Sequence, residues 1–139
     1  MPYSFGELVV MTRPVKLTER TPGHAMVAIS IAGVGEEAWG FYPKGVKDEI
    51  AEGGWHRYNR QSVIPISKKQ YTDMKTEIEK WKSKDYIMGY RDCTDFALAV
   101  LKAANISVPK DSIATLPDDF GADIVSLNGG GGGRCLARP

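Results

Sequence analysis

The chain has 139 residues, of which 42% are hydrophobic and 25% charged, and its formal net charge at pH 7 is +1. This is the length of one ordinary domain, which can bury a core without a metal or a disulfide. The small net charge excludes a general electrostatic attraction to nucleic acid or to an anionic membrane, so partners must be argued from particular sites.

Membrane and export signals are missing from the sequence pattern. No stretch approaches the roughly 18 to 20 consecutive apolar residues of a membrane span. The opening MPYSFGELVVMTRP lacks the basic segment, apolar run and small-residue cleavage site of a signal peptide. We therefore expect a protein made in the cytoplasm, with no membrane insertion and no nucleic-acid partner.

Three β-like runs come first along the chain. They lie at 7–15, at 24–31 and in EEAWGFYP, which ends at Pro43. A glycine-containing turn at 33–35 joins the second and third runs and predicts an antiparallel hairpin.

The segment after the hairpin has a weaker pattern. Residues 44–61 read as irregular, with three glycines that interrupt the pattern. SVIPIS, at 62–67, predicts one more short strand, and Pro65 places that strand at the edge of a sheet because proline cannot donate to a neighbour.

Ser67 begins the clearest predicted helix. Ser-Lys-Lys-Gln is a capping box, in which the first and fourth side chains bond each other's backbone. The following apolar residues recur at helical spacing on one face: Tyr71, Met74, Ile78 and Trp81. We expect this face to be core packing rather than a ligand site.

Two more helices are predicted toward the end of the chain. In the first, Asp92 is the N-cap, Asp95 follows three residues on, and the helix ends near NISVP. Its buried stripe is expected to be Phe96, Ala97, Val100, Leu101 and Ala104. TLPDDFGADIVSL predicts the second, which begins near Thr115 or Leu116 with Pro117 in its first turn. We expect an α+β domain at 1–126 and a flexible glycine-rich tail at 127–139.

The two cysteines differ in their surroundings. Cys135 lies in the glycine-rich tail, which predicts an exposed free thiol rather than a disulfide. Cys93 falls at the first position of the Asp92-capped helix, where partial positive charge and unpaired amides favour a thiolate and an oxyanion. The alternative is that Cys93 is a small buried hydrophobe, as most free cysteines are.

The two histidines differ as well. His24 is the first residue of an apolar run, where a strand can project an imidazole into a cleft while the rest of the strand is anchored in the core. His56, in GGWHRYNR, reads as a surface loop residue. A base at a strand start and a thiol at a helix start are what a cysteine nucleophile needs, so we pair His24 with Cys93.

These residues occur in a recognisable order. A strand-start histidine, a hairpin with WGFYP, a capped helix after IPIS, and Tyr-x6-Cys-Thr-Asp-Phe-Ala opening a helix resemble the circularly permuted papain-like (NlpC-type) cysteine peptidases and amidases. Within roughly residues 22–125, the pattern is most similar to peptidoglycan-hydrolase effector domains of type VI secretion, with Tyr86 as the motif tyrosine. The resemblance implies a permuted papain-like fold, in which a small antiparallel sheet packs against helices. It also implies Cys93 as nucleophile and His24 as general base.

The resemblance further implies a third polar residue, on the strand after the histidine, that orients the imidazole. If the hairpin turns at Val34, Tyr42 lies diagonally beside His24 on the same face. Its phenol could then accept a hydrogen bond without burying a charge. The interval usual in the family falls instead near Glu36 or Glu37. We favour Tyr42 and keep the glutamates as alternatives, although tyrosine departs from the usual His, Asn or Gln.

Other kinds of site have little support. Two histidines and two cysteines at unrelated spacings make no zinc site, and the glycine run is followed by no Lys-Ser, so it is no phosphate loop. Asp48 and Glu49 are adjacent and read as first-turn helix charge or solvated surface. We expect no cofactor and no metal.

The expected function is a thiol hydrolase that cleaves an amide bond. By resemblance, the substrate is a peptidoglycan stem peptide, and the protein is a monomeric antibacterial toxin that a secretion machine delivers to a target cell's periplasm. Its other partner would be a cognate immunity protein. Alternatives are an acyltransferase or deamidase of the same fold, or a non-catalytic binding domain.

Overall fold

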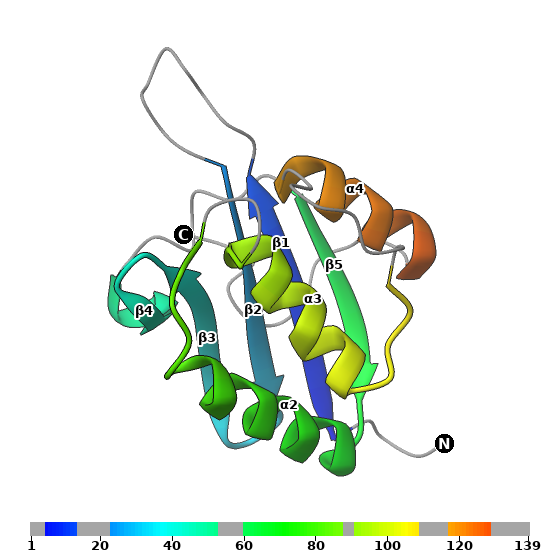
Figure 1. The fold of residues 1–139 in the computed structure, drawn as a ribbon. Helices are drawn as coiled ribbons and strands as arrows, with labels where there is room; N and C mark the ends of the chain where they lie inside the picture. The colour runs from blue at the N-terminus through cyan, green and yellow to red at the C-terminus, as the bar shows by residue number, and fades with distance from the viewer. Residues whose placement is uncertain (1–4, 14–22, 53–59, 88–90, 109–116, 129–139) are drawn as a thin grey trace.

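The computed structural model of the chain describes residues 5–13, 23–52, 60–87, 91–108 and 117–128. Within them, five strands form one antiparallel sheet in the order β4-β3-β2-β1-β5 (Figure 1). The strands are β1 Gly6–Arg13, β2 His24–Ile31, β3 Gly35–Tyr42, β4 Gly45–Asp48 and β5 Arg60–Ile66.

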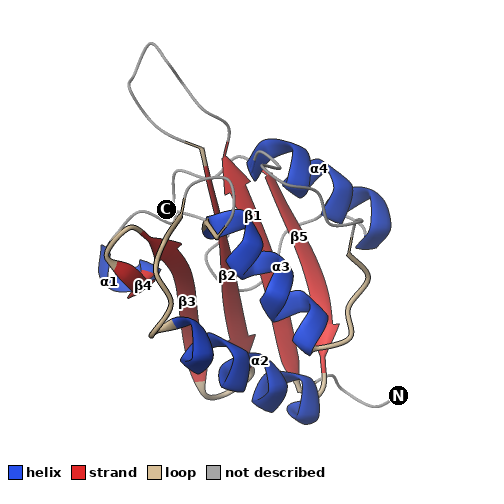
Figure 2. Cartoon of the chain, in the orientation of Figure 1, coloured by secondary structure: helices blue, strands red, loops and turns tan. Residues whose placement is uncertain are grey.

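Four helical segments accompany the sheet: α1 Glu49–Glu52, α2 Lys68–Trp81, α3 Cys93–Ala103 and α4 Pro117–Asn128. Side chains of α2, α3 and α4 share one core with one face of the sheet, and Figure 2 looks onto that face with α3 across its middle. The short α1 lies next to β3 and β4. The α+β class is thus confirmed, whereas the permuted papain-like fold stays a prediction. No helix in the described ranges has the length and apolar character needed to cross a membrane.

The predicted hairpin of β2 and β3 is confirmed, with a different register from the one expected. Met26 pairs with Gly40 and Ile31 with Gly35, so the turn is centred on Gly33 rather than on Val34. Gly33 has φ of 76°, a conformation that glycine adopts without a steric penalty. Continuing this register sets Tyr42 directly opposite His24.

The segment expected to be irregular contains ordered elements, which corrects that expectation. β4 pairs with β3 through a tight turn, with Tyr42 opposite Gly45. Gly45 has φ of 110°, so this glycine makes the turn possible instead of interrupting structure. α1 follows β4 directly. His56 lies outside the described residues.

The local helix signals are confirmed. Ser67 and Asp92 both form complete capping boxes, with Gln70 and Asp95 as their partners. β5, which contains Pro65, is an edge strand.

The third predicted helix is also confirmed, because α4 begins at Pro117. Thr115 and Leu116 lie outside the described part of the chain, as does Cys135. α4 continues to Asn128, two residues past the expected domain boundary at 126.

The two faces of the sheet hold different clusters. Ala25, Val27 and Ile29 of β2 pack on the helix side in the same cluster as Cys93. Met26 and Ala28 pack in a second cluster with Val9, Met11 and Ala38. Because side chains alternate along a strand, His24 belongs to the face opposite the helices.

Candidate active site

His24 and Glu49, the first residue of α1, are both buried and lie within ion-pair distance of each other. His24 Nε2 lies 2.7 Å from Glu49 Oε2, and the side chains are 5% and 0% exposed. Gly40 of β3 leaves the room for this contact, because a Cβ at that position would lie 2.8 Å from His24 Nε2. The contact therefore depends on the missing side chain of a strand residue.

Tyr42 completes the group on this face. Its hydroxyl donates to Glu49 Oε1 over 2.7 Å, so both carboxylate oxygens are engaged. Its ring stacks on the imidazole, with centroids 4.5 Å apart and planes at 28°. The structure thus brings the predicted Tyr42 to His24, but the carboxylate that contacts both side chains is Glu49. We call His24, Tyr42 and Glu49 the imidazole cluster.

Glu49 is the residue that the sequence reading missed. Glu49 was expected, with Asp48, to be first-turn helix charge or solvated surface. It does begin α1 but is fully buried, whereas Asp48 is exposed and accepts from the Ile50 amide over 3.0 Å. The reason is tertiary: β4 folds back along β3, which places the start of α1 against Gly40. The one sequence signal was Gly40, a strand glycine on the face that carries His24.

The alternatives for the third residue lie elsewhere. Glu36 is exposed near the hairpin turn, and Glu37 pairs with Ile29, five residues along β2 from His24. Glu37 accepts from Lys75 over 2.6 Å and from Trp39 and Tyr71 over 2.8 Å each. The structure brings neither glutamate to the imidazole.

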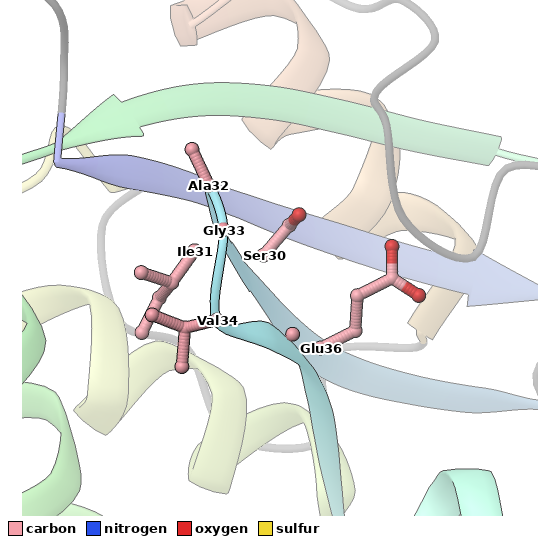
Figure 3. A pocket seen from close by; sticks show the side chains of 7 residues that line it. Ser30, Ile31, Ala32, Gly33, Val34 and Glu36 are labelled. Carbon is pink, nitrogen blue, oxygen red and sulfur yellow. The ribbon is translucent and has the colours of Figure 1, made fainter.

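A shallow hollow opens at the same end of the hairpin. It is lined by residues 30–36, with the side chains of Ser30 and Glu36 beside it (Figure 3). Because it lies at the far end of β2 from His24, the hollow is separate from the imidazole cluster.

Cys93 is the first residue of α3, as predicted. Asp92 Oδ1 accepts from the amides of Thr94 and Asp95 over 3.1 and 3.3 Å, and Asp95 accepts from the Asp92 amide over 3.0 Å. Both aspartates therefore serve as caps, which leaves the sulfur at the amide-rich end of the helix.

The Cys93 thiol is only 4% exposed. Burial raises its pKa from 9.0 to about 11, and the Asp92 charge adds to the rise. The backbone of Ala25 and the side chain and backbone of Thr94 act in the opposite direction and lower the pKa in part. At neutral pH, Cys93 in this environment is a thiol and not a thiolate.

The predicted pair of Cys93 and His24 belongs to the same region, the start of β2, but to opposite faces of the sheet. The sulfur's neighbours are Ala25 and Thr94, and Ala25 directly follows His24. The Ala25 side chain lies on the helix side, whereas the imidazole packs over Gly40 on the other side. The sheet thus separates the two side chains, although Ala25, the residue after His24, is a neighbour of the sulfur.

Tyr86 lies beside the thiol on the helix side. Its ring is 5.4 Å from the Phe41 ring, centroid to centroid. Its pKa is raised to about 12, mainly by burial, and the charges of Cys93, Asp92 and Asp95 add to the rise. The motif tyrosine is therefore a neutral, half-buried neighbour of the predicted nucleophile.

Comparisons with protein-family models, with curated proteins and with solved structures found no match for this chain.

Proposed function

We propose that the chain is a thiol hydrolase that cleaves an amide bond, with Cys93 as nucleophile and His24 as general base. The observation that carries the proposal is the placement of the sulfur at the start of α3, beside the first residues of β2, where His24 is bonded to a buried carboxylate. A carboxylate that orients an imidazole next to a nucleophile is the arrangement of catalytic triads. In this proposal Glu49 holds the imidazole in its resting position, and Tyr42 holds Glu49.

The raised pKa of Cys93 decides the form of the reaction. A thiol with a pKa of about 11 enters as S–H, so His24 must take its proton as the sulfur attacks the carbonyl carbon. Nε2 is bonded to Glu49 in the resting structure, so the proton passes to the imidazole only after the ring has moved to the sulfur. The backbone amide of Cys93 stabilises the oxyanion, and the proton then goes to the leaving amine. Water releases the acyl group from sulfur.

The reaction requires the imidazole to reach the sulfur from the other face of the sheet. His24 is the first residue of β2, so its side chain lies where the strand begins. In this proposal a change in the His24 side-chain torsions breaks the contact with Glu49 and carries the ring to the sulfur.

The substrate is proposed from the sequence resemblance: a peptidoglycan stem peptide, attacked in a target cell's periplasm after delivery by a secretion machine. A monomeric toxin of this kind requires an immunity protein in the producing cell. Incubation with peptidoglycan, and separately with acyl lipids or glutamine-containing proteins, tests the substrate class. New muropeptide fragments support hydrolysis, whereas acyl transfer or loss of ammonia identifies one of the alternative chemistries.

Variants at the two proposed catalytic residues test the mechanism. Cys93→Ala and His24→Gln are each expected to abolish fragment release, while Cys135→Ser retains it. Glutamine is chosen at 24 because its amide can still donate to Glu49 but cannot act as a base. Activity that persists in either variant contradicts the mechanism, and thermal melts show whether the variants are folded.

A non-catalytic binding domain is the second candidate, because Cys93 is buried in the core and has a raised pKa. Alkylation of Cys93 in a Cys135→Ser background separates the two candidates. If His24 acts as base, His24→Gln slows alkylation by iodoacetamide. An unchanged rate, together with no activity on any substrate, favours the binding domain.

A further inference from the structure

Two buried hydroxyls in the described part of the chain have no hydrogen-bond partner: Thr12 Oγ1 and Thr94 Oγ1. The two residues are 1% and 3% exposed. A buried hydroxyl without a partner is uncommon in folded proteins and destabilises them, so each one needs an explanation.

Both hydroxyls belong to the neighbourhood of Cys93. Thr94 follows Cys93 in the first turn of α3, and Thr12 is the β1 partner of Ala25, whose backbone reaches the sulfur. They differ in their placement: Thr94 is the residue next to Cys93 in α3, whereas Thr12 lies on β1 beyond Ala25. The Thr94 amide also donates to Asp92, which fixes the backbone from which the hydroxyl projects.

We propose that Thr94 is a positioning residue for Cys93, whose hydroxyl turns its proton toward the sulfur and stabilises the charge that forms there during attack. The inference deepens the proposed function and rests on it for its biological meaning. The contact itself can be tested without any substrate. A hydroxyl with another partner could not do this, which accounts for a threonine left unpaired in the core.

The other groups around the sulfur differ in their effect on the thiol pKa. Asp92 raises the thiol pKa through its charge, and Tyr86 is a neutral neighbour below pH 10. Asp95 lies on the same turn and is engaged by the Asp92 amide, and His24 is bonded to Glu49 on the other face. The Thr94 hydroxyl is a neutral donor that opposes the effect of Asp92.

The experiment measures the alkylation rate of Cys93 by iodoacetamide between pH 7 and 9 in a Cys135→Ser background. In this range the thiolate fraction is proportional to the acid dissociation constant, so a rate ratio reports a change in the thiol pKa. Thr94→Val keeps the side-chain shape and removes the donor, and we expect it to react about tenfold more slowly, as for the loss of a hydrogen bond to a charged group. Thr94→Ser keeps the donor and should stay within about twofold of the parent.

Thr12→Val is the matched control, since it removes the other unpaired hydroxyl from the same side of the sheet. It should leave the rate unchanged. The proposal is overturned if Thr94→Val reacts like the parent, or if Thr12→Val is slowed equally. Thr94→Ala is measured as well, in case valine perturbs the fold. If the rates change as expected but no substrate is cleaved, Thr94 positions the thiol and the hydrolase proposal alone fails.

Discussion

Glu49 shows what a single residue contributes to this molecule. Its two oxygens bond an imidazole and a phenol, and the residue is fully buried. A buried carboxylate is tolerated only when it is paired and hydrogen-bonded, so the imidazole cluster is held together by this one side chain. The cluster can serve catalysis, but it also has a structural consequence.

Glu49→Gln is expected to lower the free energy of unfolding by about 1 to 3 kcal/mol, since a neutral amide forms weaker hydrogen bonds with the imidazole and the phenol than a carboxylate does. Urea unfolding measures this change. Asp48→Asn is the control at the adjacent exposed position, where the amide still caps α1 and the change should stay within about 0.5 kcal/mol. Equal losses in the two variants would contradict the role assigned to Glu49.

Ionisation of the Cys93 thiol makes the free energy of unfolding depend on pH in the alkaline range. Its pKa is raised from 9.0 to about 11, so the thiol stabilises the fold below pH 9, and this contribution is lost as pH rises through 11. A difference of this size corresponds to about 3 kcal/mol at most. Comparing urea unfolding at pH 8 and pH 10.5, we expect a smaller decrease in Cys93→Ala than in the parent, both in the Cys135→Ser background. Parallel decreases would show that the thiol does not titrate with folding.

At the scale of elements, the start of α3 combines a cap with a charge. Asp92 caps the helix through Oδ1 and raises the pKa of the Cys93 thiol beside it. Asparagine caps helices as well as aspartate does but carries no charge, so the two effects can be separated by mutation.

Asp92→Asn is expected to keep the melting temperature and to accelerate Cys93 alkylation, since the thiol pKa falls when the neighbouring charge is removed. Asp92→Ala should also accelerate alkylation but lower the stability by about 1 kcal/mol, through loss of the cap. Ser67→Ala removes the corresponding cap of α2 and serves as the control, with a similar loss of stability and no effect on the thiol. Slower alkylation in Asp92→Asn would contradict this account.

A second element-scale contact joins β3 to α2. Burial raises the pKa of Glu37, but hydrogen bonds from Lys75, Trp39 and Tyr71 outweigh burial and hold the pKa below its usual 4.5. Lys75 also lies 4.9 Å from the centroid of the Trp39 ring. The carboxylate therefore links the hairpin to the helix that covers it.

Glu37→Gln tests this link through acid sensitivity. A lowered pKa means that the carboxylate stabilises the fold above about pH 4.5 and that this contribution is lost as pH falls through the folded-state value. The parent should thus be more stable than the variant at pH 7, and the difference should shrink below pH 4. Thermal melts from pH 3 to pH 7 measure it, and a difference that grows in acid would refute the assignment.

At the scale of the whole molecule, Phe41 is the point where the layers meet. Its ring is 5.0 Å from that of Trp81, 5.4 Å from Tyr86 and 6.0 Å from Phe96. It joins β3 to α2, to α3 and to the segment before Cys93, so the core and the thiol's environment share one aromatic group.

Phe41→Ala is expected to cost about 3 to 5 kcal/mol, a large part of the roughly 5 to 15 kcal/mol that stabilises an ordinary domain. Chemical unfolding and near-ultraviolet circular dichroism measure the loss of stability and of aromatic packing. Val34→Ala, at a hairpin position that is 79% exposed, should change stability by less than about 0.5 kcal/mol. Comparable losses at the two positions would show that Phe41 is not central to the core.

Much of the fold could be predicted from local signals. Ser67 and Asp92 predict the starts of α2 and α3, because a capping box is formed by residues three positions apart. Pro65 marks an edge strand because proline lacks an amide hydrogen. The β2–β3 register was less accurate, since the pattern alone does not distinguish a turn at Gly33 from one at Val34.

The candidate site was predictable only in part. Cys93 at a helix start and His24 at a strand start follow from the sequence, as does Tyr42 near the imidazole. Glu49 could not be found in this way, because its burial depends on β4 folding back along β3 and on the missing side chain of Gly40.

Local signals predict the α+β class, the helix starts and the candidate cysteine and histidine, because capping and alternation act between neighbours in the chain. Alternation along β2 also sets Ala25 and His24 on opposite faces of a sheet. That the thiol joins the core on the Ala25 side, away from the imidazole, depends on tertiary packing. Which face is covered by α3 is a property of packing between distant segments.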